Sequence, residues 1–240
     1  MIQALSRHPT AVSPICPSPR TAYNNHYLTA ELKVQPRQQP MNGITPDLEQ
    51  FALTLYDIGA VQIGKFKLHS GKKTRIYLDL RILVSFPPVM RQAAAIYRTI
   101  LETLEFDLLA APPLAGLPLG TAVSLDMNIP MVFPRKTAKS YGTGKAIEGA
   151  WKVGQTAVII DDVITSGDSI LQAIVPLKAA GLQVRDAIIL VDREQGGRQT
   201  LAENNYTLHA AMTIRQLLAI LESHDRISSK QRAKVLKSLE

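Results

Sequence analysis

The sequence predicts an α/β fold in which a mainly parallel sheet is covered by helices on both faces. Three observations favour this fold. Apolar runs of strand length alternate with segments of helical spacing, two of the runs lead through a glycine-bearing turn into a helix, and the runs lack the polar alternation of a half-exposed sheet. The 240 residues, 46% of them hydrophobic, suffice for a domain of about 200 residues with its own core.

The segment before the first of these apolar runs predicts two helices and a strand pair. Helical spacing begins after Thr45 and ends near Gly59. Two short strands follow, joined at Ser70-Gly71, and the next helix opens at Pro87-Pro88, because proline is favoured in the first turn of a helix. The predicted ranges are helix 46–56, strands 65–68 and 75–80, and helix 87–105.

The central part twice repeats the order of apolar strand, glycine-bearing turn and helix. The first copy turns at Leu114–Gly116 and its helix runs to Met127, while the second turns at Thr165–Gly167 and its helix runs to Ala180. Because parallel strands need crossover connections of this kind, the order predicts strands of one parallel sheet. The apolar runs are 108–112, 130–133, 157–160 and 187–191, and C-terminal helices are predicted at 217–221 and 230–239.

Residues 1–40 differ in composition from the rest of the chain. They contain six prolines, and four basic residues against one acidic residue, without helical periodicity. We therefore predict a disordered or extraneous extension over 1–44 and a folded domain over 45–240. Three explanations of the extension stay open: an organellar targeting peptide, a solvated tail, or a start-site artefact in which Met41 is the first residue.

Composition narrows the class of partner and compartment. A net charge of +7 with only 5% aromatic residues is a weak basis for binding nucleic acid, which relies on dense basic patches and base stacking. No apolar run approaches the ~20 residues that a membrane-spanning helix needs. The single cysteine, Cys16, allows no disulfide within one chain, which fits a reducing compartment. We expect a cytoplasmic protein that binds neither nucleic acid nor membrane.

The run 161–169, at the end of an apolar strand, is the main candidate site. The strand brings it to the carboxyl edge of the sheet, where open α/β folds bind ligands. Its hydroxyl side chains, the small Gly167 and the unpaired N–H groups of the helix that begins there predict a site for a phosphate monoester. The carboxylates of Asp161 and Asp162 suit a ribose diol or water on a magnesium ion. A strand end with an N-cap and no ligand is the alternative, and without a Walker sequence triphosphate hydrolysis is not predicted.

The longer run 158–169 resembles the 5-phosphoribosyl-1-pyrophosphate (PRPP) signature of type I phosphoribosyltransferases. Further motifs are similar to those of the orotate phosphoribosyltransferases in that family: a hood at 64–71 with 76–81, a mobile catalytic loop at 135–143, and a base-recognition segment at 191–197. The resemblance begins near Asp47 and is close to the transferase half of bifunctional UMP synthases. A decarboxylase barrel of about 250 residues has no room in this chain.

The resemblance implies the type I phosphoribosyltransferase fold, with a mainly parallel five-stranded sheet flanked by helices and a small N-terminal hood. The implied boundaries are about 45–85 for the hood, 86–212 for the core and 213–240 for C-terminal helices. The implied reaction joins orotate to PRPP and yields orotidine 5′-monophosphate and pyrophosphate, in de novo pyrimidine biosynthesis. Magnesium is expected to be held through PRPP, not by a protein metal cage. The family also implies a homodimer with a loop acting in the neighbour's site, and a separate orotidine-phosphate decarboxylase is a candidate partner.

The resemblance also assigns catalytic and PRPP-binding residues. Lys139 is expected to be the main catalytic cation, with Lys136, because positive charge stabilises departing pyrophosphate. Asp161 and Asp162 complete the catalytic set, and a solvated basic loop is the alternative for the lysines. The PRPP-binding set is Arg135, Lys136, Lys139, Tyr141, Asp161, Asp162, Val163, Ile164, Thr165, Ser166, Gly167, Asp168, Ser169 and His69.

Arg193 is the candidate for recognition of orotate, and Thr165 is expected to approach the same base. A guanidinium presents forked donors that match the carboxylate and the imide-like edge of orotate. An ion pair of Arg193 with Asp192 or Glu194 is the alternative.

Two departures from the family pattern fall on the pyrophosphate side. His69 stands where lysine is usual, and Pro112–Gly116 replaces the common Val-Pro-Tyr-Thr-Ala. In addition, Tyr141 in the loop stands where some members have histidine. Two other functions therefore stay open. A transferase for another base is disfavoured by Arg193 and the hood motif, and a non-enzymatic PRPP-sensing regulator is disfavoured by the two loop lysines.

Overall fold

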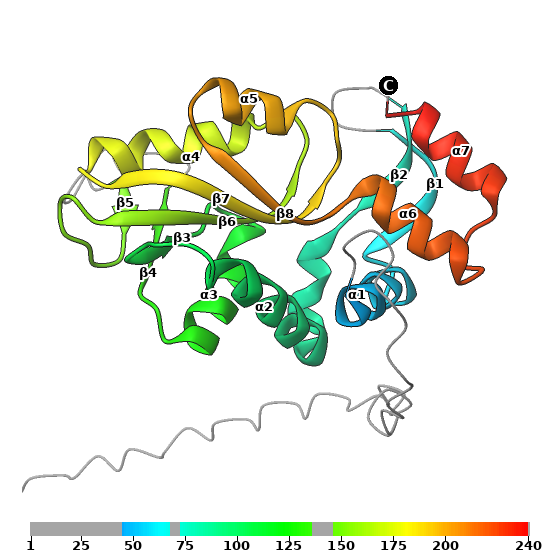
Figure 1. Cartoon of the computed structure of the whole chain (residues 1–240), viewed down its shortest axis with the longest axis horizontal. Helices are drawn as coiled ribbons and strands as arrows, with labels where there is room; N and C mark the ends of the chain where they lie inside the picture. Colours follow the sequence, from blue (N-terminus) through cyan, green and yellow to red (C-terminus); the bar gives the residue numbers. More distant parts are fainter. Residues whose placement is uncertain (1–44, 68–72, 136–145, 240) are drawn as a thin grey trace, which may run out of the picture. The chain divides into compact units, whose positions relative to one another are not determined.

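The computed structural model describes residues 45–67, 73–135 and 146–239, all within one compact unit. The predicted extension over 1–44 lies outside these residues. The central feature is a six-stranded sheet with the strand order β5-β4-β3-β6-β7-β8 (Figure 1). Its strands are β3 (Leu108–Ala110), β4 (Met131–Pro134), β5 (Ile147–Glu148), β6 (Thr156–Ile164), β7 (Gln183–Asp192) and β8 (Thr207–Thr213).

Five neighbouring strands of this sheet, β4, β3, β6, β7 and β8, are parallel, which confirms the predicted mainly parallel sheet. The sixth strand, β5, pairs antiparallel with β4 through only two residues, too few to leave a periodic pattern in the sequence. The other strand without a predicted range is β8. Because β8 lies at the edge of the sheet, its residues are mostly half-exposed and do not form a continuous apolar run.

Helices cover both faces of the sheet (Figure 1). On one face lie α2 (Pro87–Leu101) and α3 (Gly116–Met127), and on the other α4 (Asp168–Ala179) and α5 (Gly197–Glu203). Alternate residues of β6 enter different cores: Val158 packs with the α2–α3 side, while Ile159 packs with the α4 side, and both are fully buried. This two-sided burial is the physical reason for the continuous apolar runs.

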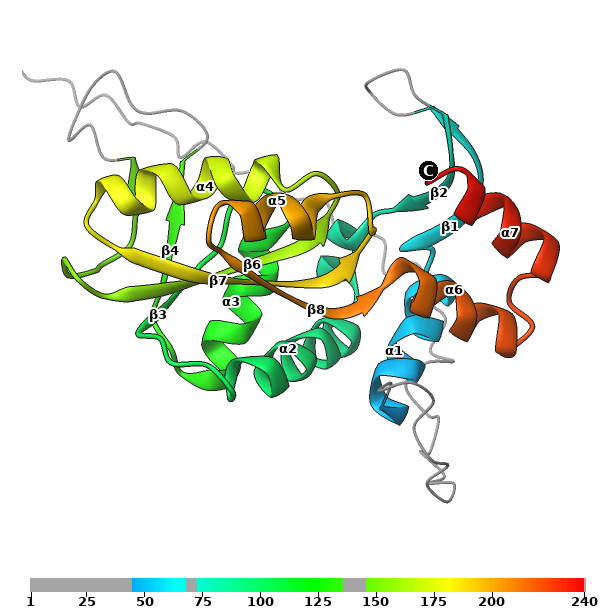
Figure 2. The same ribbon diagram turned by 45° about the horizontal axis from the view of Figure 1, so that its top comes forward.

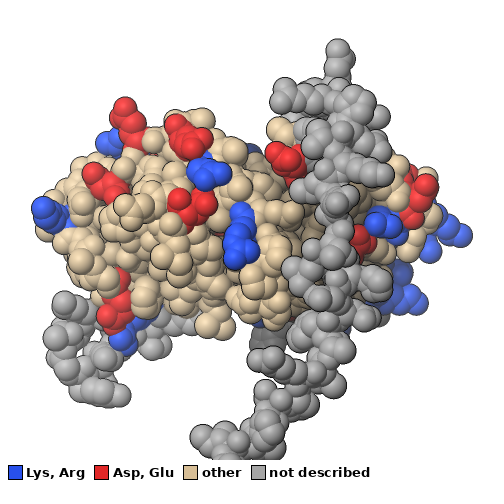
Figure 3. Space-filling view, turned by 90° about the horizontal axis from the view of Figure 1, so that it is seen from below, with Lys and Arg blue, Asp and Glu red and all other residues tan. Residues whose placement is uncertain are grey.

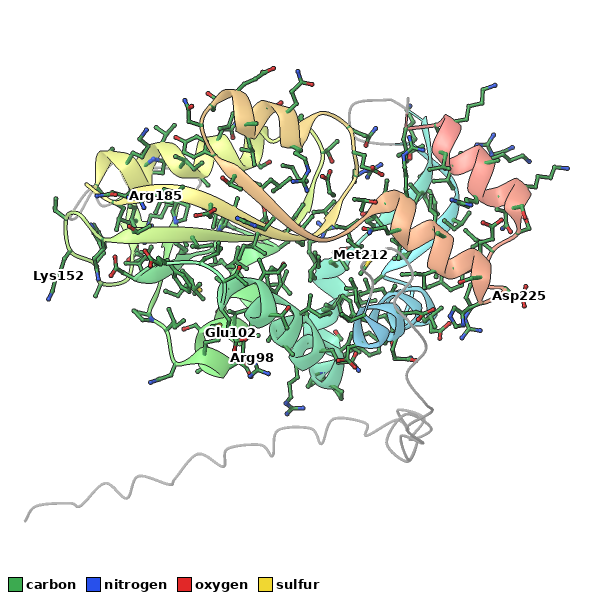
Figure 4. All side chains as sticks on the ribbon, viewed as in Figure 1. Arg98, Glu102, Lys152, Arg185, Met212 and Asp225 are labelled. Carbon is green, nitrogen blue, oxygen red and sulfur yellow. The ribbon has the colours of Figure 1, made fainter. Side chains whose placement is uncertain are left out.

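One ion pair joins the ends of α2 and α3. Arg98, in the last turn of α2, reaches Asp126 of α3 at 3.0 Å and lies 3.9 Å from Glu102 (Figure 4). These side chains are partly exposed, so the pairs contribute at most about 1 kcal/mol. Helix α2 ends at Leu101, four residues before its predicted end, because the chain turns there to enter β3.

The N-terminal hood packs against the C-terminal helices (Figure 2). An antiparallel hairpin packs with α1 and α7, while α6 packs against α1 and α7. Met212, near the end of β8, is buried in the core that contains Phe51 of α1 and Leu217 of α6 (Figure 4). The hood elements are α1 (Pro46–Asp57), β1 (Val61–Lys67), β2 (Lys73–Leu78) and the 3-10 helix η3 (Leu80–Ser85), and the C-terminal helices are α6 (Ile214–Ser223) and α7 (Ser229–Lys237).

The surface seen from below carries mixed charge. On the part of this face that the structure describes, acidic and basic side chains are interspersed among uncharged ones (Figure 3). A field of one sign, of the kind that steers polyanions, is therefore not formed on this part of the face. Among the described helices, none has the length and apolar character to cross a membrane.

Candidate active site

A pocket of about 650 Å³ lies where the chain changes direction across the sheet. Strands β3 and β6 are neighbours, but α3 follows β3 on one face and α4 follows β6 on the other. Such a switch point leaves a crevice at the carboxyl ends of the strands, where α/β folds bind ligands. The pocket is lined by Leu78, Arg81, Pro112, Pro113, Leu114, Ala115, Pro134, Arg135, Asp161, Asp162, Val163, Ser169, Gln172 and Ala173.

The acidic pair lies within strand β6. The sequence suggested that this strand ends at Ile160, but it continues to Ile164, because β7 offers backbone partners in register as far as Asp192. Asp161 is 9% exposed and Asp162 is half-buried. Both line the pocket while their backbone stays fixed in the sheet, so their positions are set by the core and not by a loop.

The environment of the pair favours protonation. Asp161 Oδ1 accepts the N–H of Asp162 at 3.0 Å, and Asp162 Oδ1 accepts that of Val163 at 2.8 Å. Burial, with a further contribution from the Asp162 charge, raises the pKa of Asp161 to about 7, and burial also raises the pKa of Asp162. Burial thus destabilises the ionised form of the pair. A neighbour that donates hydrogen bonds or carries positive charge would stabilise that form.

A buried tyrosine supports the strand beneath the pair. Tyr97 of α2 is fully buried, and its hydroxyl donates to the Asp161 carbonyl oxygen at 2.6 Å. Burial raises the pKa of Tyr97 well above its usual value, so the hydroxyl keeps its proton. The sequence shows Tyr97 only as one residue of an amphipathic helix, and its contact depends on the packing of α2 under β6.

The turn after β6 presents its polar groups outward. Thr165, Ser166, Asp168 and Ser169 are exposed, and Ile164 is buried behind them. Ser166 Oγ donates to Asp168 Oδ2 at 2.7 Å. Gly167 has a φ of 91°, a conformation that favours glycine.

The helix that follows this turn has no side-chain cap. The N-cap of α4 is Gly167, whereas α1, α6 and α7 are capped by the side chains of Thr45, Thr213 and Ser228. The first N–H groups of α4 are therefore left for water or a ligand, at the positive end of the helix dipole. This confirms the uncapped, outward-facing helix start that the sequence predicts.

The turn after β3 forms the opposite wall with backbone and apolar atoms. Pro112 and Pro113 precede the exposed Leu114, and Ala115, the N-cap residue of α3, provides no side-chain cap. Gly116 packs so closely that a Cβ there would lie 2.6 Å from the Ile160 carbonyl oxygen and 3.3 Å from Asp161 Oδ1. The turn after β3 thus packs directly against strand β6 beside the acidic pair, with no side chain between them at Gly116.

Two arginines line the pocket. Arg135, a predicted PRPP contact, pairs with Glu148 of β5. Arg81 of η3, which the sequence placed only in the hood motif, donates to both carboxylate oxygens of Asp79, at 2.7 and 3.0 Å, and to the Tyr77 hydroxyl at 3.2 Å. Its charge lowers the otherwise raised pKa of Asp162. The predicted site residues Lys136, Lys139, Tyr141 and His69 lie outside the described residues.

Arg193 follows β7 and is tied to the turn after β6. Its N–H donates to the Ile164 carbonyl at 3.1 Å, and the N–H of Gly197 donates to the Thr165 carbonyl at 2.8 Å. The half-buried guanidinium donates from Nε to Gln195 Oε1 at 2.9 Å, and burial lowers the pKa of Arg193. Arg193 is not in the wall of the 650 Å³ pocket, so the pocket and Arg193 are two parts of the candidate site.

The alternative ion pair of Arg193 does not occur among the described residues. Asp192, 2% exposed, pairs with Arg198 at 3.2 Å, and Glu194 pairs with Arg215 at 3.5 Å. Both neighbouring carboxylates thus have other arginines as partners. A half-buried guanidinium without a carboxylate partner is stabilised when an anion binds to it.

Known proteins are similar to this chain both in sequence and in architecture. The phosphoribosyl transferase domain family matches residues 83–205. An orotate phosphoribosyltransferase of Caenorhabditis elegans is 37% identical over 191 residues, which cover 79% of this chain and 84% of that protein. The chain belongs to the phosphoribosyltransferase family. The matched range of this phosphoribosyltransferase contains both turns, the acidic pair and Arg193, whereas the hairpin and the C-terminal helices lie outside it.

Two longer relatives contain a similar region. The uridine 5′-monophosphate synthase of Bos taurus is 41% identical over 177 residues, which cover 73% of this chain and 37% of that protein. The solved structure of the UMP synthase of Leishmania donovani superposes with a TM-score of 0.74 at 39% identity, covering 80% of this chain and 42% of that one. The phosphoribosyltransferase described here therefore spans less than half the length of these two relatives.

Proposed function

We propose that this phosphoribosyltransferase transfers the ribose phosphate of PRPP to orotate, yielding orotidine 5′-monophosphate and pyrophosphate for pyrimidine biosynthesis. The observation that carries the proposal is the pairing pattern after β7, where Arg193 has no carboxylate partner among the described residues while Asp192 and Glu194 are occupied by other arginines. Orotate supplies the carboxylate that would match the free donors of Arg193.

The turn after β6 supports binding of the ribose phosphate. The uncapped start of α4 and the exposed hydroxyls of Thr165, Ser166 and Ser169 would hold the 5′-phosphate. Asp161 and Asp162 would accept hydrogen bonds from the ribose hydroxyls. These donors would stabilise the ionised carboxylates, which burial destabilises. The ribose would then lie between the phosphate turn and Arg193.

In the reaction the bond between the anomeric carbon and pyrophosphate breaks, and a bond to a ring nitrogen of orotate forms. The ring nitrogen is itself the nucleophile and its proton passes to the departing pyrophosphate or to water as the new bond forms, so the protein needs no side-chain nucleophile. Its contribution is orientation of the two substrates and stabilisation of the charge on pyrophosphate. Lys139, with Lys136 and Arg135, would stabilise that charge.

Magnesium fits the described residues as an ion carried by the substrate. The carboxylate oxygens of Asp161 and Asp162 line the pocket and are suited to metal-bound water. When bound, magnesium supplies neutralisation of pyrophosphate charge. The residues named here would orient its water ligands and the ribose hydroxyls.

An assay with a panel of bases tests the function. The purified chain is incubated with PRPP, magnesium and orotate, uracil, adenine or hypoxanthine, and loss of base and release of pyrophosphate are measured. Turnover with orotate alone supports the proposal. Turnover with another base but not orotate, or tight PRPP binding by calorimetry without turnover of any base, would overturn it.

Lys139→Ala tests the role of the loop. We expect turnover to fall by about 10²-fold or more, while the affinity for PRPP changes far less, because the lysine acts on charge that develops in the transition state. Lys152→Ala is the matched control, since Lys152 is exposed and lies just before the start of β6, at the end of the strand away from Asp161 and Asp162 (Figure 4). Equal loss of binding and turnover would contradict the assigned role.

We further propose a homodimer in which the loop 135–143 of one subunit acts in the site of the other. Mixing Lys139→Ala with Asp162→Asn subunits tests this arrangement. If the loop acts in trans, exchanged dimers contain one intact site and recover about one quarter of the wild-type activity. If it acts in cis, the mixture stays as inactive as its components. The product would pass to an orotidine-phosphate decarboxylase.

A further inference from the structure

One side-chain amide joins Arg193 to the C-terminal segment. Gln195 Oε1 accepts from Arg193 Nε at 2.9 Å, and Gln195 Nε2 donates to the Leu239 carbonyl oxygen at 3.2 Å. Both functional ends of the amide are therefore used, one on each side. The contact spans 44 residues of sequence and is absent from any local pattern.

The amide is the one side-chain hydrogen-bond partner of the Arg193 guanidinium within the described ranges. Arginine has a long stem, and holding it in a single rotamer costs conformational entropy. A bond at Nε restricts the plane of the guanidinium and leaves the two terminal nitrogens for a ligand. Gln195 thus determines where the forked donors of Arg193 point.

The backbone around Gln195 is held from both sides. Glu194 and Gly196 both have a positive φ, 55° and 96°, and the Glu194 N–H donates to Asp192 Oδ1 at 2.8 Å. The Arg215 N–H donates to Glu194 Oε2 at 3.3 Å. Because this turn is fixed, the Gln195 side chain has little freedom to follow a displaced arginine.

The other end of the amide is anchored to the hood. Leu239 follows α7, which packs against β2 and pairs with α6 through Arg232 and Glu222 at 2.8 Å. Ser238 Oγ accepts the N–H of Arg75 of β2 at 3.3 Å. The Leu239 carbonyl is therefore presented by a segment that is packed against and bonded to the hood.

We infer that Gln195 is a positioning residue for Arg193, and that the Leu239 carbonyl holds Gln195 in place, so that the C-terminal segment contributes to the affinity for the anionic base. The inference rests on the proposed function, because orotate is the ligand assigned to Arg193. It predicts an effect on the base and not on PRPP, because the Gln195 side chain makes no hydrogen bond to the turn 165–169 among the described residues.

Steady-state kinetics of Gln195→Met and Gln195→Glu test the inference. Gln195→Met keeps the length of the side chain but removes both hydrogen bonds, and we expect the KM for orotate to rise about tenfold while kcat and the KM for PRPP stay within about twofold. Gln195→Glu keeps an acceptor for Arg193 Nε but introduces a carboxylate that competes with the substrate for the guanidinium, so the KM for orotate should rise at least as much. Gln199→Met is the matched control, because Gln199 is exposed and bonds only to Glu203 at 2.9 Å.

A chain that ends at Ser238 tests the part of Leu239. We expect the KM for orotate to rise in the otherwise wild-type chain, and no further rise when the truncation is combined with Gln195→Met, because both changes remove the same contact. Ser238→Ala, which loses the bond to β2 but keeps the Leu239 carbonyl, should have the smaller effect. Melting temperatures of all variants separate positioning from unfolding.

The outcomes distinguish this inference from the proposed function. A wild-type chain that does not turn over orotate overturns the function, and this inference with it. An active wild-type chain whose Gln195→Met variant keeps its KM for orotate within about twofold overturns the inference alone. Additive effects of the truncation and Gln195→Met would overturn the role of Leu239 and leave that of Gln195.

Discussion

Asp161-Asp162 in β6 and Arg193 just after β7 are two groups of opposite charge on neighbouring strands that do not pair with each other. The acids lie within β6, fixed by the ladder to β7 and supported by Tyr97. The arginine lies on a loop, oriented by the single side chain of Gln195. One half of the site is thus part of the sheet, while the other depends on a few side-chain contacts.

The difference shows how charge can be kept available for a ligand. Burial raises the pKa of Asp161 to about 7, so the acids can avoid a net charge by holding a proton. Arg193 cannot lose its charge near neutral pH, and its neighbouring carboxylates are instead occupied by Arg198 and Arg215. Proton uptake lets Asp161 remain in the pocket without an ion-pair partner. The pairing of Asp192 and Glu194 with other arginines leaves Arg193 available to a ligand.

Replacing Arg193 should give the largest effect. For Arg193→Met we expect kcat/KM for orotate to fall by about 10²- to 10³-fold, because two charge-assisted hydrogen bonds to the substrate are lost. The free energy of unfolding should stay the same or rise, since a half-buried charge without a carboxylate partner is removed. Kinetics and urea unfolding of the same preparation measure both quantities.

Arg198→Met is the matched control for that comparison. It removes the partner of the buried Asp192 carboxylate, so we expect the protein to lose roughly 1–3 kcal/mol of stability. A variant pair in which Arg193→Met destabilises more than Arg198→Met would show that the assignment of paired and available arginines is wrong.

Asp161→Asn should have the next largest effect, and its sign depends on pH. The folded carboxyl holds its proton up to a pKa of about 7, whereas the unfolded one releases it near the ordinary value of 3.8. The folded state therefore binds more protons between about pH 4 and 7, and wild-type stability falls as pH rises through that window. Asn has no such loss, so the variant should be more stable by about 4 kcal/mol at pH 8 and equal to wild type below pH 4.

Urea unfolding between pH 4 and pH 8 measures the effect of Asp161→Asn. Asp225→Asn is the control, because Asp225 is exposed at the end of α6 and asparagine tolerates its φ of 56° (Figure 4). The two variants should differ at high pH only. A gain for Asp161→Asn that is independent of pH would contradict a proton on Asp161.

Gly116→Ala tests how tightly the acids are packed against the turn after β3. The new Cβ would lie 2.6 Å from the Ile160 carbonyl oxygen, so we expect a loss of stability of about 1–3 kcal/mol and weaker PRPP binding. Gly154→Ala is the control, because its φ of 91° is strained for alanine but its surroundings are empty within 4 Å. Unfolding and calorimetric titration with PRPP separate backbone strain from damage to the site.

Tyr97→Phe should give the smallest effect. It removes one hydrogen bond, to the Asp161 carbonyl at 2.6 Å, and we expect a loss of about 1 kcal/mol with little change in volume. For the control, Tyr206→Phe, stability should change by less, because that hydroxyl accepts only a long contact of 3.4 Å from the exposed Lys178. If the two variants are equal, Tyr97 does not support the acidic strand.

Much of the fold follows from local patterns. The helix after Pro87-Pro88 and the buried strands are set by residue spacing and by burial on both faces, and the structure places them within a few residues of their predicted ends. Strands β5 and β8 were not identified, because edge strands bury too little to produce an apolar run. The extension of β6 past Ile160 depends on pairing with β7, which no local pattern of polar residues reveals.

The sequence by itself determined the parallel α/β architecture and singled out the turn at 165–169 and Arg193 as candidate site residues, since each depends on residues that are adjacent in the chain. Only the tertiary structure decided which charges are paired. The partners of Asp192 and Glu194, the contact of Gln195 with Leu239 and the place of Arg81 in the pocket all join separate segments. Interactions of this kind depend on three-dimensional packing and burial, which determine whether a charge is available to a ligand or already neutralised.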